Sequence, residues 1–195
     1  MKKRERIGER YRENSAMLPV HEDYIFDQNA AEVRSLRYGE KYSVDYNGCG
    51  AIAVHNVMKH IGRTQNFIDV LRELEELHLL WLGGAFGTKP WALGRYFQSK
   101  KIPYRKYKSP NDFKAALLTH QIGVVCTWNK RFRGMHFYCV YYSLKENKYY
   151  TANLHTPSSE FVPADLQEMI NYRFIIGYAV QNPVIRTRTL FTKLT

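Results

Sequence analysis

The chain has 195 residues and a mass of 23.0 kDa; 45% of the residues are hydrophobic and 24% are charged, with 12 Gly and 7 Pro. These proportions exclude a disordered or collagen-like chain. They indicate one globular domain whose core is large enough to fold without metals or disulfides. The three cysteines form no CxxC pair and cannot all be paired with one another, which favours a reducing compartment or a single working thiol.

The formal net charge of +11 is concentrated at the two ends of the chain. Residues 1–12 contain six basic and two acidic residues, and residues 186–195 contain three basic residues and no acidic one. We therefore predict a basic flexible tail over 1–16, a single domain over 17–185 and a basic C-terminal end over 186–195. This distribution disfavours a nucleic-acid partner, although the basic and tyrosine-rich stretch 104–108 keeps a nucleic-acid binder as an alternative.

The sequence predicts a soluble protein without a membrane-spanning segment. Its longest uninterrupted apolar run, Phe174 to Val180, is far shorter than the roughly 20 residues that a membrane-spanning helix needs. The basic start, Met1 to Ser15, is not followed by an apolar stretch and a cleavage site, so it does not resemble a secretory signal. We expect a cytoplasmic location.

Helices are predicted through the first two thirds of the chain. The clearest begins with Asn47 as its N-cap residue, carries Cys49 in its first turn and ends at Gly62. Its apolar residues cover most of the circumference, which is typical of a largely buried helix. Further helices are predicted over 67–79, 90–100 and 110–120, with a glycine-rich loop at 83–87.

The pattern changes after residue 121. Segments rich in Val, Ile, Tyr, Phe and Thr, which are typical of strands, lie at 122–128, 135–142, 147–153 and 173–180. Short charged or turn-forming stretches separate several of them. Helices followed by consecutive strands predict an α+β domain with a mainly antiparallel sheet.

Cys49 is the first candidate for chemistry, because unpaired N–H groups and the helix dipole at a helix N-terminus favour a thiolate. Such a thiol becomes a nucleophile only if a base and a group that orients the base lie nearby. His136 begins one predicted strand and Asn153 ends the next, so a hairpin brings both to one end of the sheet. His155 is a weaker alternative base, and a buried, inert Cys49 remains the competing interpretation.

The other cysteines and histidines indicate structural roles. Cys126 and Cys139 lie in apolar strands, where thiols usually belong to the core. His55 and His60 are five residues apart and do not share a helix face, so they predict no metal site. We expect no metal and no organic cofactor.

Several segments resemble, in order, those of papain-like cysteine peptidases. The group that is most similar is the bacteriocin-processing, double-glycine leader peptidase-like group. The matching stretches are Asn47 to Val54, Gly87 to Leu93, Gly134 to Val140 and Tyr149 to Leu154. Together they cover roughly residues 40–160.

The resemblance implies a papain-like fold with a central buried helix carrying Cys49. It implies Cys49 as nucleophile, His136 as general base and acid, and Asn153 as the residue that fixes the imidazole tautomer. The implied partner is a peptide or protein substrate. The expected activity is that of a cysteine peptidase or a related thiol-dependent amide or acyl-transfer enzyme.

The sequence departs from this family at the oxyanion site. The family pairs the N–H of the nucleophile with a Gln side chain about six residues upstream, a position that Ser43 occupies here. Ser43 and Asn47 are the candidate replacement donors. Because one such donor contributes about 2.7–4 kcal/mol of transition-state stabilisation, a non-catalytic papain-fold protein that binds a peptide or partner is the alternative function.

Overall fold

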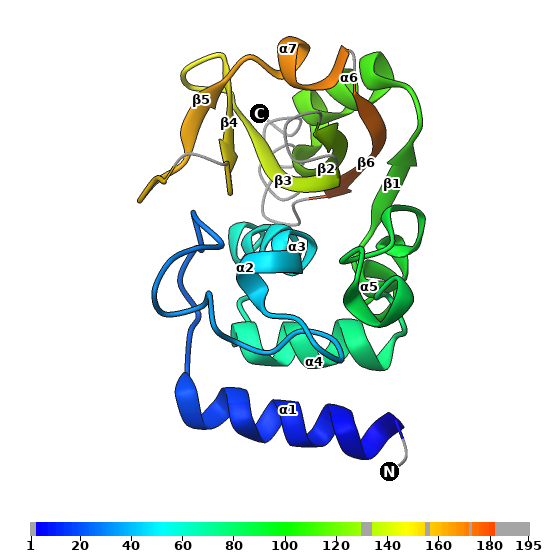
Figure 1. The fold of residues 1–195 in the computed structure, drawn as a ribbon. Helices are drawn as coiled ribbons and strands as arrows, with labels where there is room; N and C mark the ends of the chain where they lie inside the picture. Colours follow the sequence, from blue (N-terminus) through cyan, green and yellow to red (C-terminus); the bar gives the residue numbers. More distant parts are fainter. Residues whose placement is uncertain (1–2, 130–133, 155–156, 172, 182–195) are drawn as a thin grey trace.

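The computed structural model describes residues 3–129, 134–154, 157–171 and 173–181. Its α-helices lie in layers below and above a sheet (Figure 1). They are α1 (Lys3–Met17), α2 (Val44–Asn47), α3 (Cys49–His60), α4 (Phe67–Glu76), α5 (Gly94–Ser99), α6 (Pro110–His120) and α7 (Leu166–Asn171). Two short 3-10 helices, η1 (Leu82–Gly84) and η2 (Pro90–Ala92), lie between α4 and α5.

The six strands form one antiparallel sheet with the order β1-β6-β2-β3-β4-β5. They are β1 (Tyr104–Tyr107), β2 (Gln121–Asn129), β3 (Gly134–Ser143), β4 (Lys148–Ala152), β5 (Val162–Ala164) and β6 (Phe174–Gln181). The hairpins β2–β3 and β3–β4 place β3 between its two neighbours in sequence. The α+β architecture expected from the sequence is confirmed.

Two cores cover the two faces of the sheet, as the alternation of side chains along a strand requires. Phe137 and Cys139 of β3 belong to the core shared with α3 and α4, whereas Tyr138 and Val140 belong to the core under α6 and α7. Both Cys126 and Cys139 are fully buried and free, which confirms their structural interpretation. The helix that carries Cys49 therefore packs directly on one face of the sheet.

Helix α3 matches the sequence prediction closely but starts differently. Its residues from Cys49 to Met58 are all buried, and Gly62, with φ 72°, follows its end. The N-cap residue is Gly48 rather than Asn47, because α2 continues to Asn47 directly before it. The prediction of Asn47 as a helix cap was wrong.

The other helices and strands have bounds that differ from those predicted. The helix predicted over 67–79 ends at Glu76, and the one predicted over 90–100 is divided into η2 and α5. The four predicted strands are β2, β3, β4 and β6, and each of their bounds differs from the prediction by one residue. Within the described part of the chain, no helix is long and apolar enough to cross a membrane.

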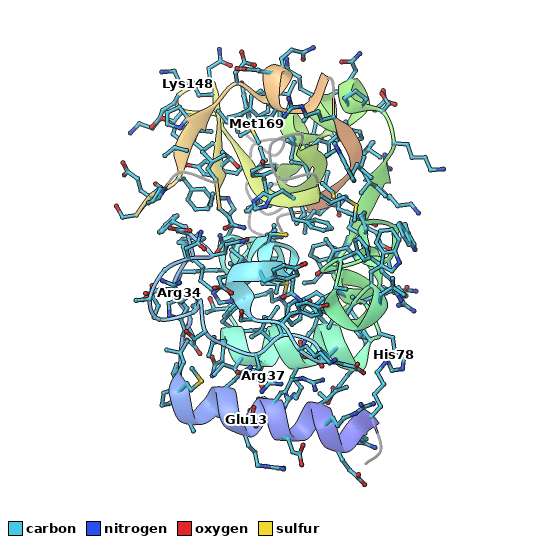
Figure 2. All side chains as sticks on the ribbon, viewed as in Figure 1. Glu13, Arg34, Arg37, His78, Lys148 and Met169 are labelled. Carbon is cyan, nitrogen blue, oxygen red and sulfur yellow. The ribbon has the colours of Figure 1, made fainter. Side chains whose placement is uncertain are left out.

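The predicted flexible tail over 1–16 is corrected by the structure, since α1 spans Lys3–Met17 and packs against α4. The buried Arg10 guanidinium donates to the Glu75 carboxylate. Asn14 exchanges two hydrogen bonds with the main chain of Arg37, at 2.9 and 2.7 Å. In Figure 2, Glu13 of α1 lies next to Arg37, and their side chains form an ion pair at 3.6 Å. These attachments are polar, so the hydropathy pattern did not reveal them.

Candidate active site

Cys49 is the first residue of α3 and lies between α2 and the loop that follows η1. Two flanking glycines make this position possible. A Cβ on Gly48 would lie 2.6 Å from the Val44 carbonyl oxygen, and a Cβ on Gly50 would overlap the Thr88 hydroxyl. The close approach of these segments places the thiol at the start of the buried helix, where the side chain is 8% exposed.

The thiol of Cys49 is surrounded by main-chain N–H groups. The N–H groups of Phe137, Gly50 and Cys49 itself favour the negative charge of the thiolate. Burial raises the pKa of Cys49 to about 11, although these three N–H groups lower it. The thiol of the unliganded protein is therefore neutral at pH 7, and it needs a base to become a nucleophile.

His136 is supplied by β3, where it pairs in register with Thr127 of β2. The N–H of Phe137, the residue that follows His136 in β3, is the one that favours the Cys49 thiolate. The ring is buried and packs edge-on against Tyr138 at 4.5 Å between centroids. The structure thus places the strand that carries His136 next to the helix that carries Cys49.

The imidazole of His136 contacts Asn153 at 2.7 Å, from Nε2 to the main-chain carbonyl oxygen. Because a carbonyl only accepts, Nε2 must carry the proton, and Nδ1 is the basic nitrogen of the neutral ring. The contact therefore comes from the main chain of Asn153. The side-chain carbonyl that we expected to hold the imidazole accepts instead from the N–H of Gln28, at 3.0 Å.

The two predicted oxyanion donors have other partners. Asn47 donates from Nδ2 to the carbonyl oxygens of Tyr38 and Gly84, at 2.9 Å each, which uses both of its amide hydrogens. The Ser43 hydroxyl donates to the Asp45 carboxylate. We therefore correct the assignment of Asn47 and Ser43: both hold the turns around the site, and the N–H groups at the start of α3 are the donors near the thiol.

A surface that we call the aromatic surface lies on the segments next to the N-terminus of α3. It consists of the exposed residues Tyr46, Leu82, Phe86 and Trp91 and the half-buried residues Tyr42 and Trp81. The Tyr46 and Phe86 side chains are 63% and 58% exposed. The loop that carries Phe86 is the one whose Gly84 and Thr88 contact Asn47 and Gly50, so this surface borders the N-terminus of α3.

Gln28 is a residue of this region that the sequence analysis did not select. It lies 21 residues upstream of Cys49, far from the position that the family glutamine would occupy, and no local pattern marks it. The alternative base His155 and the C-terminal end over 186–195 lie outside the described residues. Among the residues that the structure describes, no group of three or more His, Cys, Asp or Glu side chains could hold a metal ion.

Comparison with known proteins identifies a solved structure with the same fold. The peptidase domain of Streptococcus ComA, a bi-functional ABC transporter involved in a quorum-sensing pathway, is similar with a TM-score of 0.50 and 21% sequence identity. The similarity covers 74% of this chain and 98% of that domain. No protein-family model and no curated protein matches the sequence. The likeness confirms the papain-like peptidase-domain fold.

Proposed function

We propose that this protein is a cysteine peptidase, or a related thiol-dependent amide or acyl-transfer enzyme, with Cys49 as nucleophile and His136 as general base and acid. The observation that carries the proposal is the position of the Cys49 thiol at the start of a buried helix, where the N–H of Phe137, the residue after His136, favours the thiolate. The fold shared with a peptidase domain supports the same conclusion. Asn153 completes the site by holding His136.

The proposed reaction starts from a neutral thiol, because burial raises the pKa of Cys49 to about 11. His136 takes the thiol proton as sulfur attacks the substrate carbonyl carbon and the C–S bond forms. The N–H groups of Cys49 and Gly50 are in place to donate to the oxyanion. The C–N bond then breaks, the amine leaves with the proton from His136, and water hydrolyses the thioester.

The proposed substrate class follows from the aromatic surface that borders the N-terminus of α3. A peptide that enters beside α3 meets the aromatic surface, whose exposed rings offer apolar area to a side chain near the scissile bond. We therefore propose peptides with an apolar or aromatic residue near the cleaved bond as substrates.

Acetylation by p-nitrophenyl acetate tests the nucleophile without knowledge of the substrate. We expect p-nitrophenol release and an acetyl group on Cys49, located by mass spectrometry. His136→Ala should lower the acetylation rate about 100-fold, because the proton acceptor is lost. The same protein would then be incubated with a peptide mixture, and the cleavage products sequenced by mass spectrometry.

Cys49→Ala should abolish both acetylation at this position and peptide cleavage while the fold is kept. Cys126→Ala is the matched control, since Cys126 is also a buried free thiol but lies within β2. It should leave both rates unchanged. Peptide cleavage that survives in Cys49→Ala would contradict the mechanism.

Peptide or partner binding without catalysis is the second candidate function. It is favoured by the hydrogen bonds that occupy Asn47 and Ser43 and by the raised pKa of Cys49. It predicts saturable binding of peptides at the aromatic surface, no acetylation of Cys49 and no cleavage product. Trp91→Ala should weaken that binding, since Trp91 is a large exposed ring of the surface.

A further inference from the structure

A segment that we call the strap, residues 19–28, runs along the helical layer toward the candidate active site. At its start, the His21 N–H donates to Asn66 Oδ1 at 3.1 Å. In its middle, Ile25 exchanges hydrogen bonds with the Asn56 side chain of α3, at 3.0 and 2.7 Å. Polar side chains of the helices therefore fix the strap along its length.

The end of the strap holds Asn153 by two hydrogen bonds. The Asn153 N–H donates to the Phe26 carbonyl oxygen at 2.9 Å, and Asn153 Oδ1 accepts from the Gln28 N–H at 3.0 Å. Asn153 is fully buried and has φ 64°, a left-handed conformation that Asn adopts more readily than most residues. The side-chain oxygen and the main-chain N–H of Asn153 both bind the strap, and its main-chain carbonyl contacts His136.

The geometry points to a division of roles within Asn153, an inference that rests on the proposed function. Its main-chain carbonyl is the group that orients His136 and fixes the Nε2–H tautomer, whereas its side chain anchors the strap. Asn153 is then a positioning residue that acts through its backbone conformation. The identity of the side chain matters because it stabilises that conformation, and no carboxamide contact with the imidazole is needed.

Gln28 is a second positioning residue in the same arrangement. Its Nε2 donates to the Asp45 carbonyl oxygen at 2.7 Å, and Asp45 belongs to α2, which directly precedes the helix that begins at Cys49. The Gln28 main chain binds the residue that holds His136, and its side chain binds the turn that leads to the thiol. One strap residue thus connects the supports of the base and of the nucleophile.

Asn153→Gly separates the two roles, because glycine adopts a positive φ freely and keeps both the N–H and the carbonyl. We expect the ¹⁵N spectrum of imidazole-labelled protein to retain the Nε2–H tautomer of His136, assigned by its disappearance in His136→Gln. The Gln28 amide, which loses its acceptor, should exchange with solvent about tenfold faster.

Asn147→Gly is the matched control, since Asn147 also has a positive φ, 53°, but lies exposed in the turn between β3 and β4. It should change neither the tautomer nor the Gln28 exchange rate. Loss or reversal of the His136 tautomer in Asn153→Gly, with the amide spectrum otherwise preserved, would overturn the inference and assign the orienting role to the side chain. The tautomer is measured without turnover, so failure of Cys49 to become acetylated would contradict the proposed function alone.

Discussion

Helices α3 and α1 pack against the same helix, α4, from opposite sides, but different chemistry holds them (Figure 1). The buried face of α3 is almost wholly apolar, with Ala51, Ile52, Ala53 and Val54 fully buried. The buried face of α1 consists of Ile7, Arg10 and Asn14. The comparison teaches that a helical face can be specified by hydrogen bonds and ion pairs as well as by apolar burial, and hydropathy detects only the second kind.

The largest expected effect lies on the apolar side of this comparison. Ile52→Ala should lower the free energy of unfolding by about 4 kcal/mol, because it removes buried methyl groups and leaves a cavity in the core beneath the sheet. Urea denaturation followed by circular dichroism measures the change. Leu144→Ala, at a residue that is 65% exposed, is the control and should change stability by less than about 0.5 kcal/mol.

On the polar side of the comparison, Glu75→Ala should lower the free energy of unfolding by about 3 kcal/mol, because it leaves the buried Arg10 guanidinium without its carboxylate. It also removes the acceptor of the Gly39 N–H. Limited proteolysis should then cut within α1 before it cuts elsewhere. The double variant Arg10→Met with Glu75→Leu should recover most of the lost stability, since apolar side chains of similar size avoid the unpaired charge. Equal losses in the single and double variants would refute this account of α1.

A smaller, pH-dependent effect comes from His55, which holds the strap by donating from Nε2 to the Asp23 carbonyl oxygen at 2.8 Å. Burial lowers its pKa from 6.5 to about 4. As the pH falls below 6.5, the unfolded chain binds a proton at His55 before the folded chain does, so stability is lost between pH 6.5 and about 4. The contribution of His55 to the free energy of unfolding should fall by about 2 kcal/mol between pH 7 and pH 5.

The variant His55→Gln isolates the pH-dependent contribution of His55 to stability, because a Gln side chain can donate to the same carbonyl and does not titrate. Denaturant unfolding at several pH values should show a shallower stability loss in His55→Gln than in the unchanged chain. A His55→Gln profile that parallels the unchanged chain would show that His55 is not the group responsible.

Much of the fold and part of the site were predictable from the residues alone. Helix α3 is recognisable because apolar residues cover most of its circumference between clear end signals, and the strands β2, β3, β4 and β6 are rich in β-branched and aromatic residues, so their type followed from composition. The placement of Cys49 in the first turn of a buried helix and of His136 on the neighbouring strand followed in the same way. Local pattern is sufficient where apolar burial decides the structure.

The tertiary structure decided which polar groups meet. Gln28 and Asn153 are 125 residues apart, and nothing in either local sequence indicates that the N–H of one donates to the side chain of the other. The same holds for Asn47, whose amide binds Gly84 rather than serving an oxyanion. A hydrogen bond depends on the positions of two atoms to within a few tenths of an ångström. Hydrophobic burial depends only on which face is covered, so the sequence determined the layers while the assembled fold determined the contacts of the site.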